Sequence, residues 1–425
     1  MEIPVAIHNI ESGNRMRAAV LVSFLFVISM SNVYPTSITE GQLPSCNYSP
    51  YLTDLLPRDY WPTENWISST PEVQGMNSTL LNSVSEFVQT NYSGLDSVLV
   101  IRHGYIVLEE YPSEEYDIET KHSIASCRKS ITGLLIGLAI DHGFLDNVSQ
   151  KVLDFFPDYT FDNMDAWKRN ITIEHLLTMT GGFDWDESDP PYEDTLNQAH
   201  VMQSSEDPIQ YMLDLPMRSS PGTEWEYCSG GTYLLRAILW NVTGMTPFDF
   251  ASEYLFDSIG ASASWKSRLP DNEYALYSTL LMTPRDMAKF GYLYLNGGFW
   301  DGELVVSSEW ALKSTETQVS LDQKWSDVGY GYLWWTTPSV GEIYAIGYSG
   351  QLIYLLPQDD LVVVFTSPFT DHISYQNWLM DNYILPAILE STPTTIPVLE
   401  YIPFLVMIAV VPISIIVAYW YRKRK

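Results

Sequence analysis

The stretch that organises the chain runs from residue 123 to residue 138 and reads SIASCRKSITGLLIGL. Within it, apolar residues recur with the spacing of one helix face, which predicts a helix that begins near Ser126 and enters the core. These apolar residues are Ile131, Leu134, Leu135 and Leu138. One helical turn separates Ser126 from Lys129, so the two side chains lie on the same face.

Ser126 and Lys129 have the chemistry of a nucleophile and its base. A serine hydroxyl is a weak nucleophile until a neighbouring base takes its proton, and an amine buried at a helix start loses part of its preference for the charged form. The alternative is a capped helix with a solvated lysine, because an S-x-x-K pattern by itself is common by chance. The rest of the chain has to decide between the two interpretations.

A second polar pattern, Tyr227-Cys228-Ser229, follows a Pro-Gly turn and precedes a predicted helix over 234–240. In an extended backbone Tyr227 and Ser229 point the same way. A tyrosine held against a lysine ammonium loses its proton more readily, so Tyr227 would serve as a base for Ser126 and later as an acid for the leaving group.

Hydrophobic patterns elsewhere predict both helices and strands. Helices are expected over 77–90, 171–182 and 283–296, and strands over 97–102, 105–109, 329–335, 343–346, 352–356 and 361–366. Strands that follow one another through short turns imply an antiparallel sheet. His175, in the second of these helices, is expected to be an ordinary helix residue rather than a metal ligand.

Three motifs occur in order along the chain: Ser126-x-x-Lys129, Tyr227-x-Ser229 and Tyr348-Ser349-Gly350. In this order and at these separations they resemble the serine β-lactamase superfamily, which includes the penicillin-binding proteins. Within it, the chain looks most like the class C β-lactamase-related hydrolases and esterases, and especially like 6-aminohexanoate-dimer hydrolases. The resemblance covers roughly residues 60 to 390.

The resemblance implies an antiparallel sheet flanked by helices, a mostly helical region beside it, and an active site in the groove between them. Ser126 would be acylated, and Lys129 and Tyr227 would share the proton transfers. Ser229 would hold the substrate or the proton network. No metal and no cofactor are implied.

The third motif would supply the remaining substrate contacts, from Tyr348, Ser349 and Gly350. The backbone N–H groups of Ser126 and Gln351 would form the oxyanion hole, where fixed donors meet developing negative charge.

Two positions depart from the family pattern. Ser229 stands where the second motif often ends in Asn, and Tyr348 stands where the third motif usually opens with Lys or His. A cation at the latter position suits a substrate carboxylate, so its absence favours an esterase or amidase over a D,D-peptidase or β-lactamase. A catalytically silent binding module and a structural surface protein remain the non-enzymatic alternatives.

Both ends of the chain carry apolar segments. Residues 18–30 follow Arg15 and Arg17 and are typical of a secretory signal, with an uncleaved N-terminal anchor as the alternative. Residues 401–421 contain no charged residue and precede a basic tail, which predicts a transmembrane helix with its tail in the cytoplasm. We therefore expect a single-pass protein of the cell membrane whose catalytic domain lies on the extracytoplasmic side.

The expected fold class is α+β, with an antiparallel sheet, flanking helices, a helical region and a C-terminal transmembrane helix. The expected organisation is a signal peptide or anchor (1–35), an extended lead-in (36–60), a β-lactamase-like hydrolase domain (61–392), a linker (393–400), the transmembrane helix (401–421) and a basic tail (422–425). Six N-x-S/T sites permit glycosylation. These sites are Asn47, Asn77, Asn91, Asn147, Asn170 and Asn241.

The formal charge of −30, from 52 acidic and 22 basic residues, argues against a nucleic-acid partner. The expected partners are the membrane and a small ester, amide or peptide-like substrate, and the oligomeric state is open. Cys127 and Cys228 are expected as buried free thiols, with a bridge near the site as the alternative. A run of acidic residues predicts a solvated loop. Its members are Asp184, Asp186, Glu187, Asp189 and Glu193.

Overall fold

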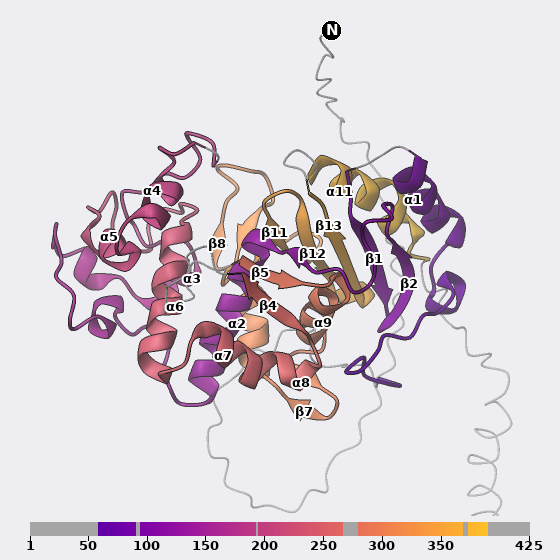
Figure 1. Cartoon of the computed structure of the whole chain (residues 1–425), viewed down its shortest axis with the longest axis horizontal. Helices are drawn as coiled ribbons and strands as arrows, with labels where there is room; N and C mark the ends of the chain where they lie inside the picture. Colours follow the sequence, from indigo (N-terminus) through magenta and orange to yellow (C-terminus); the bar gives the residue numbers. More distant parts are fainter. Residues whose placement is uncertain (1–57, 91–93, 193, 267–278, 369–372, 390–425) are drawn as a thin grey trace, which may run out of the picture. The chain divides into compact units, whose positions relative to one another are not determined.

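The largest sheet within the described part of the chain has eight strands, and every neighbouring pair is antiparallel (Figure 1). The computed structural model describes residues 58–90, 94–192, 194–266, 279–368 and 373–389. In sheet order the strands are β2 (Tyr105–Glu110), β1 (Ser97–Arg102), β13 (Leu361–Thr366), β12 (Gln351–Leu356), β11 (Glu342–Gly347), β10 (Trp335–Thr337), β9 (Gly329–Tyr330) and β8 (Val319–Ser320). The predicted antiparallel sheet is therefore confirmed.

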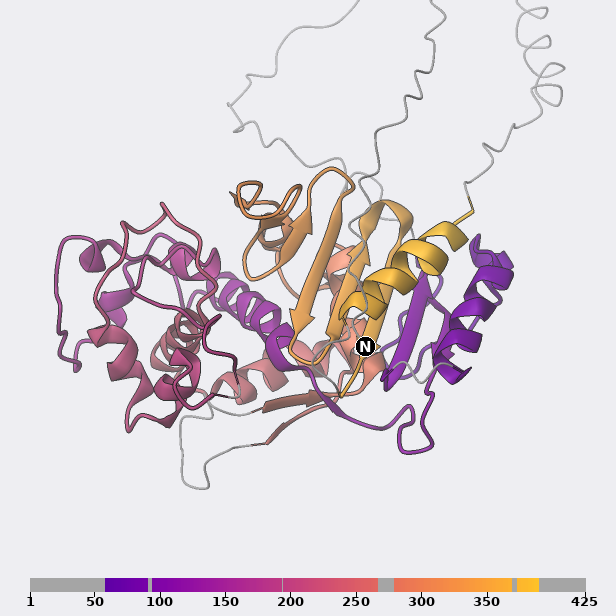
Figure 2. The ribbon, with the colours of Figure 1, turned by 90° about the horizontal axis from the view of Figure 1, so that it is seen from above.

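Helices cover both faces of this sheet (Figures 1 and 2). On one face, α1 (Ser78–Thr90) and α11 (Ile373–Leu379) lie together. On the other face, α9 (Pro284–Leu295) packs against β1, β12 and β13, while α2 (Arg128–Asp141) lies against β11. The sheet is thus buried on both sides, which is what its nearly continuous apolar strands require.

Strand β1 shows how one strand serves two cores. Successive side chains of a strand point to opposite faces. Val98 and Val100 accordingly join the cluster under α1 and α11, whereas Leu99 and Ile101 join the larger cluster that contains α2 and α9. All four side chains are fully buried.

The helical region stands beside the β8–β11 side of the sheet, at the left of Figure 1. Its helices are α3 (Ile173–Leu177), α4 (Gln198–Ser204), α5 (Pro208–Asp214) and α6 (Ser229–Thr243). Helix α6 packs against α2, α3 and α5, so α2 joins the helical region to the sheet. This arrangement matches the expected groove-forming pair of regions.

Shorter elements complete the described part of the fold. A three-stranded sheet has the order β3 (His122–Ser123), β5 (Thr279–Met282), β4 (Ala263–Lys266), and β6 (Phe299–Trp300) pairs with β7 (Glu303–Leu304). Three further helices are α7 (Pro247–Ala251), α8 (Asp257–Ile259) and α10 (Ser308–Thr315).

Two predicted elements are shorter than expected. The helix predicted over 171–182 ends at Leu177, because Met179 adopts a φ of 58° and the Thr178 hydroxyl donates to Glu174 O at 2.8 Å. The strand predicted over 329–335 is split into β9 and β10. Between them, the Leu333 N–H donates to Leu177 O at 2.9 Å, so the backbone bonds a neighbouring helix instead of a strand.

The expected membrane-spanning helix is corrected. No helix among the described residues is long and apolar enough to cross a bilayer, and the predicted segment 401–421 lies outside those residues. The C-terminal transmembrane helix in the expected fold class, the membrane partner and the single-pass location are therefore not supported. The leader (1–35), the linker (393–400), the basic tail (422–425) and most of the lead-in also lie outside the described residues.

Glycosylation stays a prediction. Asn147, Asn170 and Asn241 are exposed and Asn77 is partly buried, while Asn47 and Asn91 lie outside the described residues.

Candidate active site

Ser126 lies in a single 3-10 turn, Ala125–Cys127, that leads directly into α2. Ala125 has a φ of 45°, an uncommon conformation for a residue with a side chain and one found most often at functional sites. The buried Cys127 thiol donates to Ala345 O of β11 at 3.3 Å, which ties the turn to the sheet. A Cβ at Gly347 would come within 2.6 Å of Ile124 O, so only glycine lets β11 approach the turn this closely.

Lys129 contacts Ser126 directly. Its Nζ donates to Ser126 Oγ at 2.8 Å, and only 4% of the lysine is exposed. Burial lowers the pKa of Lys129 from 10.5 to about 8, with Glu187 opposing the shift and Arg128 adding to it. Lys129 therefore loses its proton more readily than a solvated lysine, which is the effect expected for an amine buried at a helix start.

Tyr227 completes the cluster in a different way from the one expected. The Lys129 Nζ lies 4.6 Å from the centroid of the Tyr227 ring, over the face of the ring. Burial and the nearby Glu187 carboxylate raise the pKa of Tyr227, although a hydrogen bond with Ser126 opposes them. The prediction that this tyrosine loses its proton more readily is therefore wrong, because desolvation and Glu187 outweigh the hydrogen bond with Ser126 and the charge of Arg128. Tyr227 is a neutral phenol.

Ser229 is held by a buried carboxylate. It begins α6, and both its backbone N–H and its hydroxyl donate to Glu187 at 2.8 Å. Glu187 is only 3% exposed and also accepts hydrogen bonds from Trp185 Nε1 at 2.9 Å and from the Tyr192 hydroxyl. Glu187 thus links the second motif to the loop between α3 and α4.

The predicted solvated acidic loop is wrong at Glu187 alone among its described members. Asp184, Asp186 and Asp189 are exposed as expected, and Glu193 lies outside the described residues. Burial alternates along this segment, so Glu187 lies on the inner side with Trp185. That period of two is a strand-like signal that would have found Glu187 in the sequence.

The third motif forms the turn between β11 and β12. Ser349 and Gly350 both have positive φ, 67° and 80°, and Tyr348 is 43% exposed. Gln351 begins β12 and is buried, and its carbonyl oxygen lies 3.6 Å from the Cys127 Sγ. The backbone of Gln351 therefore lies beside the turn that carries Ser126.

One cleft of about 760 Å³ is lined by all of the residues that the three motifs predicted for the site. They are Ser126, Lys129, Tyr227, Ser229, Tyr348, Ser349, Gly350 and Gln351. A cleft of this size suits a small organic substrate.

Other residues line the same cleft and were missed by sequence reasoning. At one end, His122 Nδ1 lies 3.1 Å from Asp96 Oδ2, and both side chains are buried. Helix α4 contributes His200 and Gln203. None of these belongs to a motif, because β3 and α4 reach the cleft only through tertiary packing.

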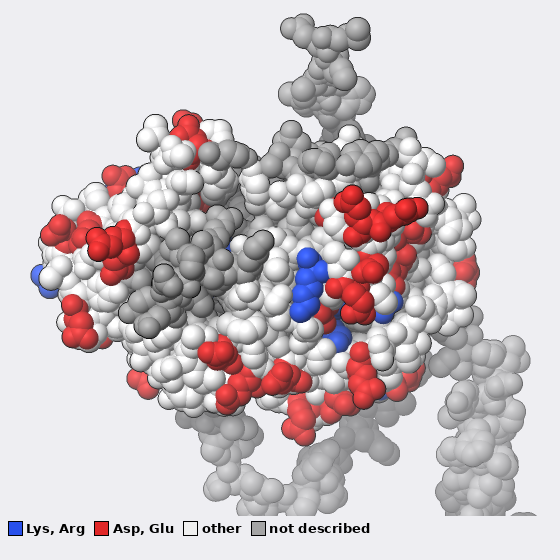
Figure 3. Space-filling view, viewed as in Figure 1, with Lys and Arg blue, Asp and Glu red and all other residues white. Residues whose placement is uncertain are grey.

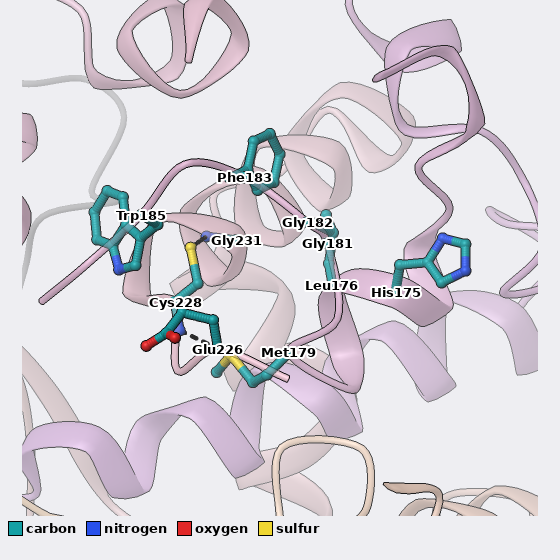
Figure 4. Close-up of a pocket in the computed structure, with 10 residues that line it drawn as sticks. All are labelled: His175, Leu176, Met179, Gly181, Gly182, Phe183, Trp185, Glu226, Cys228 and Gly231. Atoms are coloured by element: carbon teal, nitrogen blue, oxygen red, sulfur yellow. Dashed lines mark hydrogen bonds between the residues drawn. The ribbon is translucent and has the colours of Figure 1, made fainter. Parts of the chain in front are cut away.

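A much smaller hollow lies behind the second motif (Figure 4). Its volume is about 10 Å³, which is room for roughly one water molecule. Cys228 lines it, and the Cys228 N–H donates to Met179 Sδ at 3.3 Å. Cys127 and Cys228 are both buried free thiols, as predicted, and burial raises the pKa of each. The substrate-sized space is the larger cleft.

Metal ions in proteins are held by sets of donor side chains. No group of three or more His, Cys, Asp or Glu side chains in the described part of the chain is arranged to hold an ion. The clustered groups around Ser126 are an amine, a phenol and hydroxyls, which suit proton transfer rather than metal ligation.

The fold and the family comparisons together define the class of protein, which is a serine hydrolase. The Beta-lactamase family model matches residues 84–371, and the chain belongs to this family. The predicted superfamily is therefore confirmed.

Individual relatives agree. The chain is 27% identical over 295 residues to the 6-aminohexanoate-dimer hydrolase of Paenarthrobacter ureafaciens, which covers 65% of this chain and 73% of that protein. Among solved structures, EstCE1, described as a hydrolase with promiscuous acyltransferase activity, superposes with a TM-score of 0.59 at 16% identity, over 72% of this chain and 98% of that one. The octameric penicillin-binding protein homologue from Pyrococcus abyssi superposes with a TM-score of 0.57 at 19% identity, over 74% of this chain and 79% of that one. At these identities the two structures speak for the fold alone.

Proposed function

We propose that this serine hydrolase cleaves a carboxylic ester or a linear amide through an acyl-enzyme intermediate, with Ser126 as the nucleophile. The observation that carries the proposal is the 2.8 Å hydrogen bond between Ser126 Oγ and a buried lysine whose pKa is lowered to about 8. A nucleophile within hydrogen-bond reach of a poised base is what covalent catalysis requires.

In the first step, Ser126 Oγ attacks the carbonyl carbon while its proton passes to the neutral Lys129 Nζ. The carbonyl oxygen takes up the negative charge of the tetrahedral intermediate. We assign its stabilisation to the backbone N–H groups of Ser126 and Gln351, an assignment supported by the contact between Cys127 and Gln351 O.

In the second step, the bond to the leaving alcohol or amine breaks and the leaving atom takes a proton. Tyr227 is the proposed donor because its raised pKa keeps it protonated and it is hydrogen-bonded to Ser126. The proton that Lys129 took from Ser126 then restores the phenol, so both groups return to their starting protonation states. The two side chains are in contact, with Lys129 Nζ over the face of the ring. Water then attacks the acyl carbon while Lys129 accepts one of its protons. The bond between the acyl carbon and Ser126 Oγ breaks, the Lys129 ammonium gives its proton to Ser126 Oγ, and the carboxylic acid leaves.

Substrate preference is proposed from the third motif. Tyr348 stands at the cleft where the family usually has a cation for a substrate carboxylate, which supports an esterase or amidase over a β-lactamase or D,D-peptidase. The 6-aminohexanoate-dimer hydrolase relative supports a linear amide as one substrate class. A silent binding module is the remaining alternative, which the experiment below also tests.

The test compares hydrolysis of a short-chain p-nitrophenyl ester, a linear amide dimer and a chromogenic cephalosporin by the purified protein and by Ser126→Ala. We expect the ester or amide to be preferred, and Ser126→Ala to lose at least about 1,000-fold in kcat/KM. Ser130→Ala is the matched control. It removes a hydroxyl of the same helix that donates to Leu333 O and does not line the cleft.

A fluorophosphonate probe supplies a second readout, because it labels an activated serine without needing a substrate. We expect mass spectrometry to find the adduct on Ser126 in the wild type and in Ser130→Ala. If the folded wild-type protein neither labels nor turns over any of the three compounds, the enzyme mechanism fails and the silent module takes its place. If the enzyme prefers the cephalosporin, the β-lactamase alternative is favoured instead.

A further inference from the structure

Two exposed tyrosines from opposite walls of the cleft touch each other. Tyr192 belongs to the loop between α3 and α4 in the helical region, and Tyr348 belongs to the turn between β11 and β12. Their ring centroids are 5.8 Å apart and their planes are inclined by 72°, an edge-to-face contact. Both residues line the cleft that contains Ser126, and both are more than two-fifths exposed.

The two segments that carry these rings are each held by hydrogen bonds. The Tyr192 hydroxyl donates to the buried Glu187, which also holds the start of α6 through Ser229. On the other wall, Gln376 Nε2 donates to Gly350 O at 2.8 Å and the Gly350 N–H donates to Gly347 O at 3.1 Å. The contact therefore joins a tyrosine held through its hydroxyl to a tyrosine on a turn whose backbone is held.

This contact joins the two walls beside the nucleophile. Gly347, directly before Tyr348, packs against the turn that carries Ser126. On the other wall, Glu187 binds both the Tyr192 hydroxyl and Ser229, which follows Tyr227 by two residues. Both rings line the cleft that Ser126 also lines, so an acyl group attached to Ser126 shares this cleft with the pair. A bulky acyl group that extends toward the pair would have to displace one of the rings, whereas a linear one would need less room.

We propose that the Tyr192–Tyr348 contact is a steric filter that selects linear, unbranched acyl groups over bulky ones. The proposal rests on the function proposed above and names the substrate class of that same site. It also gives the aromatic side chain of the third motif a role: where a cation would bind a carboxylate, Tyr348 supplies one half of a narrow opening.

The test uses two p-nitrophenyl esters with the same leaving group, a linear butanoate and a branched 2,2-dimethylpropanoate. The measured quantity is the ratio of kcat/KM for the linear ester to kcat/KM for the branched ester. We expect Tyr348→Ala and Tyr192→Ala each to lower this ratio by about tenfold or more, the size of effect that pocket shape commonly has. The double variant should lower it little further, because either single change already removes the contact.

Tyr192→Phe is the matched control. It keeps the ring and removes only the hydroxyl that reaches Glu187, so the ratio should stay closer to that of the wild type than in Tyr192→Ala. A ratio that is unchanged in a folded Tyr348→Ala, or two single effects that add fully in the double variant, would overturn the filter. An equal rise in kcat/KM for both esters would likewise overturn the filter, because it would mean that the variants widen access to the site without changing its selectivity.

A second measurement applies if the two esters are hydrolysed too slowly for their kcat/KM values to be compared. The rates at which a straight-chain and a branched fluorophosphonate label Ser126 should follow the same order across the variants. Failure of the proposed function would look different. Either hydrolysis or labelling would persist in Ser126→Ala, or the folded wild-type protein would neither label nor turn over any ester, and in both cases the filter falls with the function.

Discussion

Lys129 decides how the rate depends on pH. It must be neutral to accept the Ser126 proton, and burial lowers its pKa to about 8. As pH rises through that value the base form increases, so kcat/KM for a neutral ester should rise and reach half of its plateau near pH 8. Because the pKa of Tyr227 is raised, its phenol stays protonated and no fall should follow at slightly higher pH.

The measurement is a pH profile of kcat/KM, with protein stability checked at each pH. A midpoint near 10.5, the ordinary lysine value, would mean that Lys129 is not desolvated in the working enzyme. A rate that falls as pH rises through 8 would contradict the assignment of Lys129 as the base.

Glu187 sets the charge around this base. Its carboxylate opposes the lowering of the Lys129 pKa, while Arg128 and Arg236 add to the lowering. Glu187→Gln should therefore lower the Lys129 pKa further and move the rising limb of the pH profile to lower pH. The plateau should also fall, because the Ser229 N–H and hydroxyl lose a charged acceptor.

Glu187→Asp is the matched variant, because it keeps the charge and changes the reach. The rising limb of its kcat/KM pH profile should stay close to that of the wild type even if the plateau of the profile drops. A Glu187→Gln limb that moves to higher pH, or does not move, would rule out this electrostatic role.

At the scale of elements, the contact between β11 and the turn before α2 aligns the site. A Cβ at Gly347 would approach Ile124 O to 2.6 Å and Gln351 Cβ to 2.9 Å. Gly347→Ala should therefore push β11 away from the turn that carries Ser126. We expect kcat/KM to fall by about 10- to 100-fold, since small displacements of catalytic groups are costly.

Gly137→Ala separates misalignment from simple overpacking. Its Cβ would approach the Trp310 ring to 2.4 Å, at the contact between α2 and α10. Overpacking costs about 1–3 kcal/mol of stability, so Tm should fall in both variants, but kcat per folded molecule should fall only in Gly347→Ala. Equal losses of kcat in the two variants would argue against a specific role for the β11 contact.

The whole molecule carries a strongly negative field. Its formal charge is −30, and Asp and Glu side chains are spread over the face shown in Figure 3. Like charges destabilise the compact state, and salt screens them within a Debye length of about 10 Å at 0.1 M. Raising NaCl from about 0.05 M to about 0.5 M should therefore increase Tm.

The measurement is thermal unfolding followed by circular dichroism across the salt series. Repeating the series with a neutral osmolyte in place of salt is the control, since it does not screen charge. A Tm that falls steadily as NaCl rises would show that attractive ion pairs outweigh the net repulsion. The pair of Arg58 with Asp360 is one described candidate for such an effect.

The amino-acid sequence by itself determined the elements and the motifs. Apolar residues at a period of 3.6 predicted α2, and apolar strands next to short turns predicted β1, β2 and β11 to β13, because these patterns are local consequences of backbone geometry. Ser126, Lys129 and Tyr227 were found in the same way, since each belongs to a short motif.

Only the tertiary structure decided the environment of those motifs. Burial lowers the pKa of Lys129 and raises that of Tyr227, and Glu187 lies inside rather than in a solvated loop. The contact between Tyr192 and Tyr348 joins segments far apart in the sequence. Desolvation, charge proximity and ring contacts depend on which segments meet in space, and no local pattern of residues carries that information.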